Sequence, residues 1–469
     1  MVRAPIASIS DDDMPGVPRA DEGVGGTRRA VRRALLSAGA GWLVGAGAVL
    51  STAATAGPFL AEFDLATLLQ ESGGDGTDGM VINGAYASDG LGRDVATADL
   101  NGDGIDDIVV SSSKLDLLDT GRTHVIFGRP SGEFPAVFEV QSLYPESGGD
   151  GSAGFSIQSQ LSDYTGESLA GVGDVNGDGV DDLALGGRFA QDVRLVGESY
   201  VVFGQDADLG GFFPPVFFLR DLRPDLEIGG DGSAGFIFSG LVPEDRLGYP
   251  LGGAGDINGD GLDDLIVAAP DTTLQTALEG VVFTLFGRDT AADGLFPARF
   301  NSVQLLPSAG GTGNEGFVTR GSAIGDRIGW SMGGGFDLNA DGRDDVLIGS
   351  LNLTPDQSGG AIVLFGRSTE DTFPPRFDAA RLLLPFGGDG TRGLFIDGIA
   401  PQDETGSALA PAGDVNGDGV DDVIIAADRA SPGGRAQAGR AYVVFGRRGI
   451  DREPFPHTRT LASAPRIGR

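Results

Sequence analysis

The sequence predicts an all-β fold built from five copies of one module, and three observations support this prediction. The nine-residue pattern Asp-x-Asn-x-Asp-Gly-x-Asp-Asp occurs five times. Its copies begin at residues 99, 174, 256, 337 and 414, so the modules repeat every 75 to 82 residues. Each copy leads into a short apolar run, such as Ile108-Val109-Val110, and no stretch keeps a helical period. Such long repeats of short strands in a chain with 80 glycines indicate a β-propeller, with one blade of about 78 residues per repeat.

Within a repeat, short strands alternate with turns. A GG-x-G-x-x-G turn, an Asp-x-x-Gly element, a strand ending in Phe-Gly and a Phe-Pro pair recur in step with the acidic loops. Small residues before the loop suit the crowded centre, where blades converge. In the third repeat the predicted strands are Phe236–Ser239, Tyr249–Gly255, Leu265–Ala268, Gly280–Gly287 and Phe300–Leu305.

The acidic pattern places oxygen atoms where a hard cation needs them. Calcium takes roughly six to eight oxygens at about 2.3–2.6 Å, often from alternate positions of a loop turned by glycine. We expect side chains at positions one, three, five and nine, and the carbonyl at position seven, to bind about five Ca²⁺ ions per chain. The candidate ligands are Asp99, Asn101, Asp103, Ile105 and Asp107; Asp174, Asn176, Asp178, Val180 and Asp182; Asp256, Asn258, Asp260, Leu262 and Asp264; Asp337, Asn339, Asp341, Arg343 and Asp345; and Asp414, Asn416, Asp418, Val420 and Asp422.

Position twelve separates these loops from EF-hands, which need a glutamate there on a helix. The residues at this position all lie in apolar runs that are typical of buried strands. They are Val110, Leu185, Val267, Ile348 and Ile425. The loops are therefore predicted to be strand–loop–strand calcium sites, with solvated Asx and glycine turns as the alternative.

At this point the residues resemble a known family, the FG-GAP repeats of integrin α-subunit propellers and of many bacterial secreted proteins. The segments Gly166–Gly186 and Gly406–Ala426 carry the signature most closely, and the resemblance spans about residues 59–450. It implies a propeller with calcium on one face and extracellular ligands on the opposite face or the rim. Integrins close with seven blades, whereas this chain has five repeats.

Two architectures remain open for the five repeats. The first is a closed five-bladed ring, and the second is a partial ring that a partner completes. A segment at residues 58–68 resembles the outer-strand segment at residues 134–143, and Phe455-Pro456 begins another copy near the C-terminus. Either end could therefore complete the last blade.

The N-terminus reads as an export signal. Arg28, Arg29, Arg32 and Arg33 precede the apolar run Ala34–Leu50, and Ala54-Thr55-Ala56 is a cleavage motif. We predict an export signal at residues 1–56, a propeller at 57–450 and a tail at 451–469 that contributes the closing outer strand. Cleavage is favoured over a retained membrane anchor, and Arg32-Arg33 hints at twin-arginine export.

Charge and composition restrict the partners. The chain has 67 acidic and 33 basic residues, a net charge of −34 and no cysteine. Such a surface disfavours nucleic acid and anionic lipid, and nothing can be joined by disulfides. Calcium is therefore the expected cross-link.

Catalytic motifs are weak. Gly329-Trp330-Ser331-Met332-Gly333 matches a nucleophile elbow but lies on a predicted inner strand, and Gly149–Gly154 matches a dinucleotide fingerprint but recurs as a turn. The carboxylates of the Asp-x-x-Gly elements are either turn caps or a circle of ligands near the channel mouth, with three arginines beside them: Arg93, Arg246 and Arg327. These carboxylates belong to Asp89, Asp163, Asp245, Asp326 and Asp403.

The sequence thus predicts a secreted or cell-surface calcium-binding propeller, of bacterial exported type, for adhesion or extracellular ligand binding. No enzymatic activity is expected, and the ligand is a protein or a glycan. The alternatives are a polysaccharide-active enzyme or lectin-like carbohydrate binder, and a structural surface or matrix protein. An enzyme would use paired carboxylates, for which acids found in one repeat only are candidates: Glu244, Glu279, Glu315 and Glu370.

Overall fold

The computed structural model describes residues 63–112, 121–159, 165–188, 196–224, 229–240, 246–272, 279–321, 325–352, 357–383, 386–448 and 458–460. The chain divides into two compact units, residues 1–50 and 51–469, and every described residue belongs to the second. The predicted export signal at residues 1–56 lies outside the described residues, as does most of the predicted tail.

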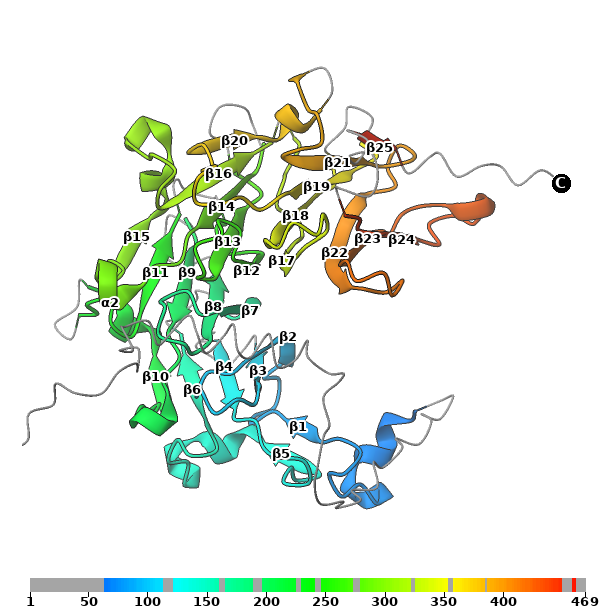
Figure 1. The fold of residues 1–469 in the computed structure, drawn as a ribbon. Helices are drawn as coiled ribbons and strands as arrows, with labels where there is room; N and C mark the ends of the chain where they lie inside the picture. Colours follow the sequence, from blue (N-terminus) through cyan, green and yellow to red (C-terminus); the bar gives the residue numbers. More distant parts are fainter. Residues whose placement is uncertain are drawn as a thin grey trace, which may run out of the picture. The chain divides into compact units, whose positions relative to one another are not determined.

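Four five-stranded sheets follow one another along the described chain (Figure 1). In each sheet the first four strands are antiparallel neighbours, and the fifth strand comes from the next repeat and pairs parallel with the fourth. The sheet orders are β2-β3-β4-β6-β10, β7-β8-β9-β11-β15, β12-β13-β14-β16-β20 and β17-β18-β19-β21-β25. Each repeat is therefore joined to the next by a shared sheet.

The strand bounds are short, as the spacing of turn residues predicts. The first sheet contains β2 (Leu91–Ala98), β3 (Asp107–Ser112), β4 (Arg122–Ile126), β6 (Gly154–Gln158) and β10 (Val216–Phe218). The second contains β7 (Ser168–Gly173), β8 (Asp182–Gly187), β9 (Glu198–Val202), β11 (Gly235–Ser239) and β15 (Arg299–Asn301). The third contains β12 (Leu251–Gly255), β13 (Asp264–Ala269), β14 (Val281–Leu285), β16 (Gly316–Arg320) and β20 (Arg376–Asp378). The fourth contains β17 (Met332–Phe336), β18 (Asp345–Ser350), β19 (Gly360–Leu364), β21 (Gly393–Asp397) and β25 (Thr458–Thr460).

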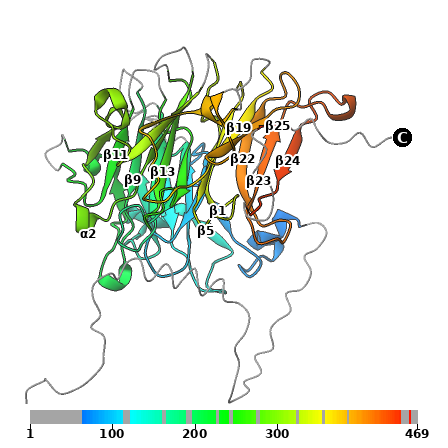
Figure 2. The ribbon, with the colours of Figure 1, turned by 45° about the horizontal axis from the view of Figure 1, so that its top comes forward.

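Two further sheets are smaller. The fifth repeat forms a three-stranded sheet of β22 (Thr405–Gly413), β23 (Asp422–Ala427) and β24 (Arg440–Val444), seen side by side in Figure 2. Near the start of the described chain, β1 (Val81–Asn83) pairs parallel with β5 (Val137–Glu139). The tail strand β25 does supply an outer strand, but it joins the fourth sheet rather than the fifth.

Helices are few and brief in the described chain, in agreement with the all-β prediction. Among the described residues, the α-helical turn is α2 (Thr290–Asp293), capped by the Asp289 carboxylate. The 3₁₀ turns are Leu65–Leu68, Gln70–Ser72, Val140–Leu143, Pro145–Ser147, Ala207–Leu209, Leu219–Leu222, Ser302–Leu305, Pro307–Ala309, Ala379–Leu382 and Pro432–Gly434. No helix among the described residues is long and apolar enough to cross a membrane.

The strand predicted at Phe300–Leu305 is wrong in its second half. The chain leaves β15 after Asn301 and enters a 3₁₀ turn over Ser302–Leu305. The Asn301 side chain accepts a hydrogen bond from the backbone N–H of Val303, which caps the turn and ends the strand. The strand predicted at Tyr249–Gly255 likewise begins only at Leu251.

Neighbouring sheets face one another across apolar layers. The first strands of successive repeats lie side by side, in the order β2, β7, β12, β17 and β22. Stacked phenylalanines fill the crossings between repeats, and the Phe-Pro residues predicted as landmarks supply one ring of each pair. The pairs are Phe155–Phe213 at 4.0 Å, Phe236–Phe296 at 4.5 Å and Phe317–Phe373 at 4.2 Å between ring centroids. The all-β prediction is confirmed, while blade number and closure into a ring stay predictions.

Candidate metal centres

Every acidic loop joins the first strand of a repeat to its second. In the first repeat, β2 ends at Ala98, the loop starts at Asp99, and β3 begins at Asp107. The other four loops occupy the same place before β8, β13, β18 and β23. The strand–loop–strand prediction is therefore confirmed, and an EF-hand helix does not follow the loop.

The loop carboxylates and amides hold the loop backbone in one conformation, repeated five times. The position-one carboxylate accepts a hydrogen bond from the N–H of the glycine at position six, as in Gly104 to Asp99 at 2.9 Å. The amide oxygen at position three accepts from the N–H of position five, as in Asp103 to Asn101 at 2.9 Å. The position-five carboxylate accepts from the N–H of position seven. These side-chain oxygens are therefore turned into the loop.

The ninth aspartate ties the loop to the rest of the sheet. One oxygen of Asp107 accepts from the N–H of Leu100 at 3.0 Å, and the other accepts from the N–H of Gly128 at 2.8 Å. A Cβ at Gly128 would lie 2.6 Å from the carbonyl oxygen of Asp106, so the Phe-Gly glycine has no room for a side chain. All five repeats make both bonds, and all five carboxylates are buried: Asp107, Asp182, Asp264, Asp345 and Asp422.

Four of these buried carboxylates lie near other acids, and both burial and the neighbouring negative charges raise their pKa values. Burial, with a smaller contribution from the negative charges of Asp99 and Asp103, raises the pKa of Asp107 to about 7. Burial likewise raises the pKa of the ninth aspartate well above its usual range in the next three loops, with carboxylates one and five again contributing. Positions one, five and nine therefore lie close enough to repel one another in at least four loops.

The donors in these loops are oxygens, the ligand type that calcium takes. The described side chains do not yet form a closed shell. Among the described residues, no group of three or more His, Cys, Asp or Glu side chains is arranged to hold a metal ion. A complete shell would need the position-three amide, the position-seven carbonyl and water beside the converging carboxylates. All 25 predicted ligands lie in described loops, and their role as ligands stays a prediction.

The eighth aspartate, to which sequence analysis assigned no role, links each loop to the loop before it. Its carboxylate accepts a hydrogen bond from the backbone N–H of position one in the preceding repeat. The donor–acceptor pairs are Asp99–Asp181 at 3.3 Å, Asp174–Asp263 at 2.8 Å, Asp256–Asp344 at 2.9 Å and Asp337–Asp421 at 3.0 Å. The sequence held a signal for this role, because aspartate occupies position eight in all five copies although it is not a predicted ligand.

Glycine makes room for this link. A Cβ at Gly173 would lie 2.0 Å from a carboxylate oxygen of Asp263, and one at Gly255 would lie 2.2 Å from Asp344. Both glycines also have positive φ angles, 71° and 64°, which side chains disfavour. At these two loops the residue before the acidic loop must therefore be small, because the next repeat's carboxylate occupies the space of a side chain.

The described Asp-x-x-Gly carboxylates, those of Asp89, Asp326 and Asp403, are not among the residues that line the cavity between the first strands. Asp89 accepts a hydrogen bond from the N–H of Tyr86, as expected of a turn cap. Asp326 and Asp403 are buried, and Asp163 and Asp245 lie outside the described residues. The arginines beside them pair with other acids: Arg93 with Glu167, and Arg246 and Arg327 with Asp271.

The catalytic motifs have structural roles where they are described. The hydroxyl of Ser331 donates to the carbonyl of Gly406 at 2.7 Å. His124 lies on β4 in another sheet, where burial lowers its pKa to about 3. The Gly149–Gly154 turn leads into β6, as predicted.

The candidate catalytic acids do not form a described pair. Glu279 is buried, and Glu315 lies 3.9 Å from Arg288. Glu370 is exposed, and Glu244 is outside the described residues.

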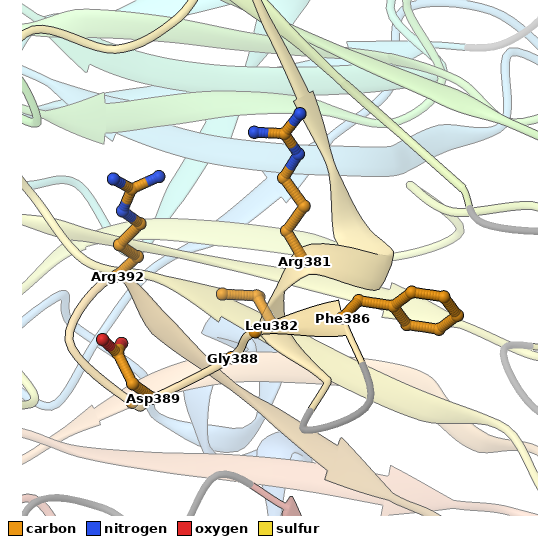
Figure 3. Close-up of a pocket in the computed structure, with 8 residues that line it drawn as sticks. Arg381, Leu382, Phe386, Gly388, Asp389 and Arg392 are labelled. Carbon is orange, nitrogen blue, oxygen red and sulfur yellow. The ribbon is translucent and has the colours of Figure 1, made fainter.

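A small cavity of about 270 Å³ lies beside one of the recurring glycine turns (Figure 3). Arg381 and Arg392 extend to the same side of it, while the Phe386 ring points away. The Asp389 carboxylate accepts bonds from the N–H and hydroxyl of Thr391, which lower its pKa. The same Asp–Ser/Thr bonds recur in three other turns, so we assign this feature to turn structure.

Comparison with known proteins agrees with this geometry. The FG-GAP repeat model matches residues 91–126, 251–281 and 405–444, each of which contains a first strand, an acidic loop and a second strand. The chain is 27% identical over 292 residues to integrin alpha pat-2 of Caenorhabditis briggsae, covering 60% of this chain and 19% of that protein. It is 24% identical over 275 residues to integrin alpha-5 of Xenopus laevis, covering 57% and 20%. It is 31% identical over 193 residues to integrin alpha-PS5 of Drosophila melanogaster, covering 40% and 16%.

These matches define the class: a protein with FG-GAP repeats that is integrin alpha-like in sequence. The aligned part of the chain spans about a fifth of the length of these relatives.

The raised pKa values predict how the metal-free protein responds to pH. A carboxyl whose folded pKa is about 7, against 3.8 unfolded, adds stability that is complete below about pH 4 and lost as pH rises through 7. Thoroughly dialysed protein should therefore melt at a higher temperature at pH 5 than at pH 8, as measured by circular dichroism. The low pKa of His124 acts in the opposite direction, but it is one group against four carboxyls.

The Asp264→Asn variant provides the control, because it removes one titrating carboxyl while keeping its shape. It should show a smaller difference between the two pH values. A melting temperature of the dialysed wild type that is flat or rises between pH 5 and pH 8 would contradict this account.

Proposed function

We propose that this chain is an exported, calcium-stabilised β-propeller that binds extracellular ligands and performs no catalysis. The observation that carries the proposal is the repetition of one acidic loop in five repeats, three of which lie within matches to the FG-GAP repeat model. With small shifts of the side chains, the carboxylates at positions one, five and nine and the amide at position three of each loop would supply oxygens to one ion. Residues 1–56 would direct the chain out of the cell, to the surface or the medium.

Calcium is the best-supported cation for these loops. The donors are all oxygens, the loops turn at glycine, and the oxygen-rich set favours a hard cation over zinc or copper. A bound Ca²⁺ would supply the positive charge that the buried ninth aspartate lacks. Because folding brings these carboxylates together, metal binding would add to folding stability.

Calorimetric titration of the dialysed chain with Ca²⁺ tests this proposal. We expect about five ions per chain and a large fall in melting temperature on chelation. The Asp260→Ala variant should bind one ion fewer, whereas Asp208→Ala, an exposed change outside the loops, should bind the same number. Fewer than three ions bound to the wild type would refute the metal assignment.

Ligand binding, rather than catalysis, is the activity that the residues support. The matched relatives are named as integrin alpha subunits, and the catalytic motifs of this chain have structural partners. The loops also occupy one end of the inner strands and leave the opposite end free for a ligand.

Glycan-array and pull-down experiments on the mature chain, with and without EDTA, test the ligand proposal. We expect a saturable protein or glycan ligand whose binding falls when EDTA destabilises the propeller. Turnover of a polysaccharide would favour the enzyme alternative, and the absence of any ligand would favour a structural surface or matrix protein.

We further propose that the five repeat sheets close into one ring through strands β24 and β1. The three-stranded sheet β22-β23-β24 lacks the fourth and fifth strands that the complete sheets have. The two-stranded sheet β1-β5 is a fourth and a fifth strand without the first three. Together they would make the missing fifth blade.

The pairing of β1 with β5 matches that of fourth and fifth strands elsewhere. Val81 pairs with Val137 as Ser156 pairs with Val216, so β1 corresponds to β6. The glycine two residues before Val81 has a φ angle of 149°, and Gly154, two residues before Ser156, has 132°. β1 also packs on the first sheet, where Met80 and Ile82 contact the cluster around Ile126.

The fifth repeat exposes an apolar face that would pack against the first sheet in a closed ring. Val443 is 45% exposed, whereas its counterpart in the first sheet, Val125, is fully buried. Val415, at loop position two, is 57% exposed, whereas its counterpart in the first repeat, Leu100, is 1% exposed. An apolar sheet face of this kind favours a covering layer.

The chain of loop links is also open at this point. Asp106, the eighth aspartate of the first loop, is exposed, and Gly413 has open space where Gly173 meets Asp263. In a closed ring, Asp106 would accept from the N–H of Asp414. Where the fifth repeat would meet the first, Asp106 and the space beside Gly413 are thus both available for the missing link.

Closure fixes a register, and an engineered disulfide tests it. By analogy with His124 opposite Ser156, Tyr442 would pair with Val81. Because the chain has no cysteine, a Tyr442→Cys, Val81→Cys double variant should form one disulfide within the monomer. The matched pair Val443→Cys, Val81→Cys points to opposite sheet faces and should not. A disulfide-linked dimer would refute closure and favour a ring completed by a partner.

The same proposal makes Asp106 a test residue for stability. In calcium, Asp263→Ala should cost about 1–3 kcal/mol, because the Asp174 N–H loses its acceptor. If the ring closes, Asp106→Ala should cost a similar amount in denaturant unfolding. A neutral Asp106→Ala together with a destabilising Asp263→Ala would indicate an open seam.

A further inference from the structure

A cavity of about 450 Å³ opens between the inner strands at the end opposite the acidic loops. It is lined by residues that start or precede first strands, such as Asp94 on β2, Tyr249 before β12 and Trp330 before β17. Since each first strand runs from this end into its acidic loop, the cavity and the loops lie at opposite ends. Four repeats supply most of its lining, and Ser407 of the fifth completes it.

The charges at the cavity are arranged as two carboxylates, each held between two guanidinium groups. Glu167 lies 3.3 Å from Arg93 and 2.6 Å from Arg188. Asp271 lies 3.0 Å from Arg246 and 3.4 Å from Arg327. Each group carries a net charge of about +1, although Arg327 reaches Asp271 without lining the cavity itself. Together with Asp94, the charged side chains of the lining are three arginines and three acids.

The exposed charge of both groups is positive. The Glu167 side chain is 8% exposed and that of Asp271 is 17% exposed, whereas Arg93 is 43% and Arg246 is 50% exposed. The acids therefore lie behind the guanidinium groups and hold them in place. The third acid, Asp94, already accepts from the N–H groups of Val95 and Leu169. Guanidinium groups fixed in this way are suited to a second, external carboxylate.

Two of these arginines stand where the backbone favours glycine. Arg246 and Arg327 have φ angles of 54° and 49°, in the left-handed region. The equivalent residue of the first repeat is Gly90, with a φ angle of 63°. A non-glycine residue in this conformation costs free energy, so the arginines are retained against a local preference. This points to a use for their side chains.

Aromatic rings lie beside the guanidinium groups. Trp330 is 42% exposed and Tyr249 is 38% exposed, although both line the cavity. The Arg188 guanidinium lies 4.8 Å from the centre of the Tyr249 ring, which fixes it by a cation–π contact. Trp330 adds a partly exposed aromatic side chain to the same lining.

We propose that this cavity binds an acidic polysaccharide, with sugar carboxylates on the arginine groups and a sugar ring against Trp330. Two separate guanidinium pairs suit a polymer with carboxylates on successive residues, and a pyranose ring offers the C–H face that an indole packs against. This inference rests on the proposed ligand-binding function and names the class of ligand.

Isothermal titration of the calcium-loaded full chain with polyglucuronic acid tests the inference. We expect saturable binding that weakens as sodium chloride is raised, and no binding of neutral dextran. Arg246→Gly, which keeps the left-handed backbone, should weaken binding about tenfold or more, and Trp330→Ala should weaken it as well. Arg220→Ala, an exposed arginine on an outer 3₁₀ turn, is the matched control and should bind as the wild type does.

The outcomes separate this inference from the proposed function. If polyglutamate binds as tightly as polyglucuronic acid, the site recognises acidic peptides and the sugar assignment is wrong. If polyglucuronic acid does not bind while the glycan array or pull-down finds another ligand, only this inference fails. Equal binding by wild type and Arg246→Gly, with unchanged melting temperatures, would also overturn it.

Discussion

A buried aspartate carboxylate at the ninth loop position is the interaction on which each repeat depends. In the first repeat, Asp107 begins the second strand, accepts from the loop at Leu100 and accepts from Gly128 after the third strand. One side chain therefore fixes three segments of a sheet. It adds to the backbone pairing of β2 with β3 and of β3 with β4. The same carboxylate is also costly to bury in its charged form, since its neighbours include acids.

This arrangement couples the stability of the sheet to the charge in the loop. Without a cation, burial is relieved by taking up a proton, which is why burial raises the pKa of Asp107 to about 7. With a cation, the carboxylate could stay ionised and keep both backbone bonds. The eighth aspartates then extend the effect, because Asp263 belongs to one loop and binds the backbone of the preceding loop. Cation binding at one loop would thus support the position of its neighbour.

The sequence predicts those features that are encoded within one repeat. The acidic loop, the strands on either side of it and the glycine turn before β6 depend on residues within about a dozen positions, so pattern and spacing suffice. The role of Asp181 could not be predicted, because its partner is the N–H of Asp99 in another repeat. The cavity was missed for the same reason, since Glu167 and Trp330 line it together only because the first strands of different repeats pack side by side. The predicted end of β15 was wrong because the Asn301 side chain accepts a hydrogen bond from the Val303 N–H, which favours a turn over a longer strand.

The two ends of the inner strands are under different constraints. At the loop end, every repeat needs the same residues, because the same backbone groups must be satisfied in each. At the cavity end, the backbone repeats but the side chains do not: one left-handed position carries Gly90, Arg246, Arg327 and Glu404 in different repeats. At that end the sheet hydrogen bonds use backbone groups only, so the fold does not require a particular side chain at this position. A repeat protein of this design can therefore change what it binds at one end while the folding requirement at the other end stays fixed.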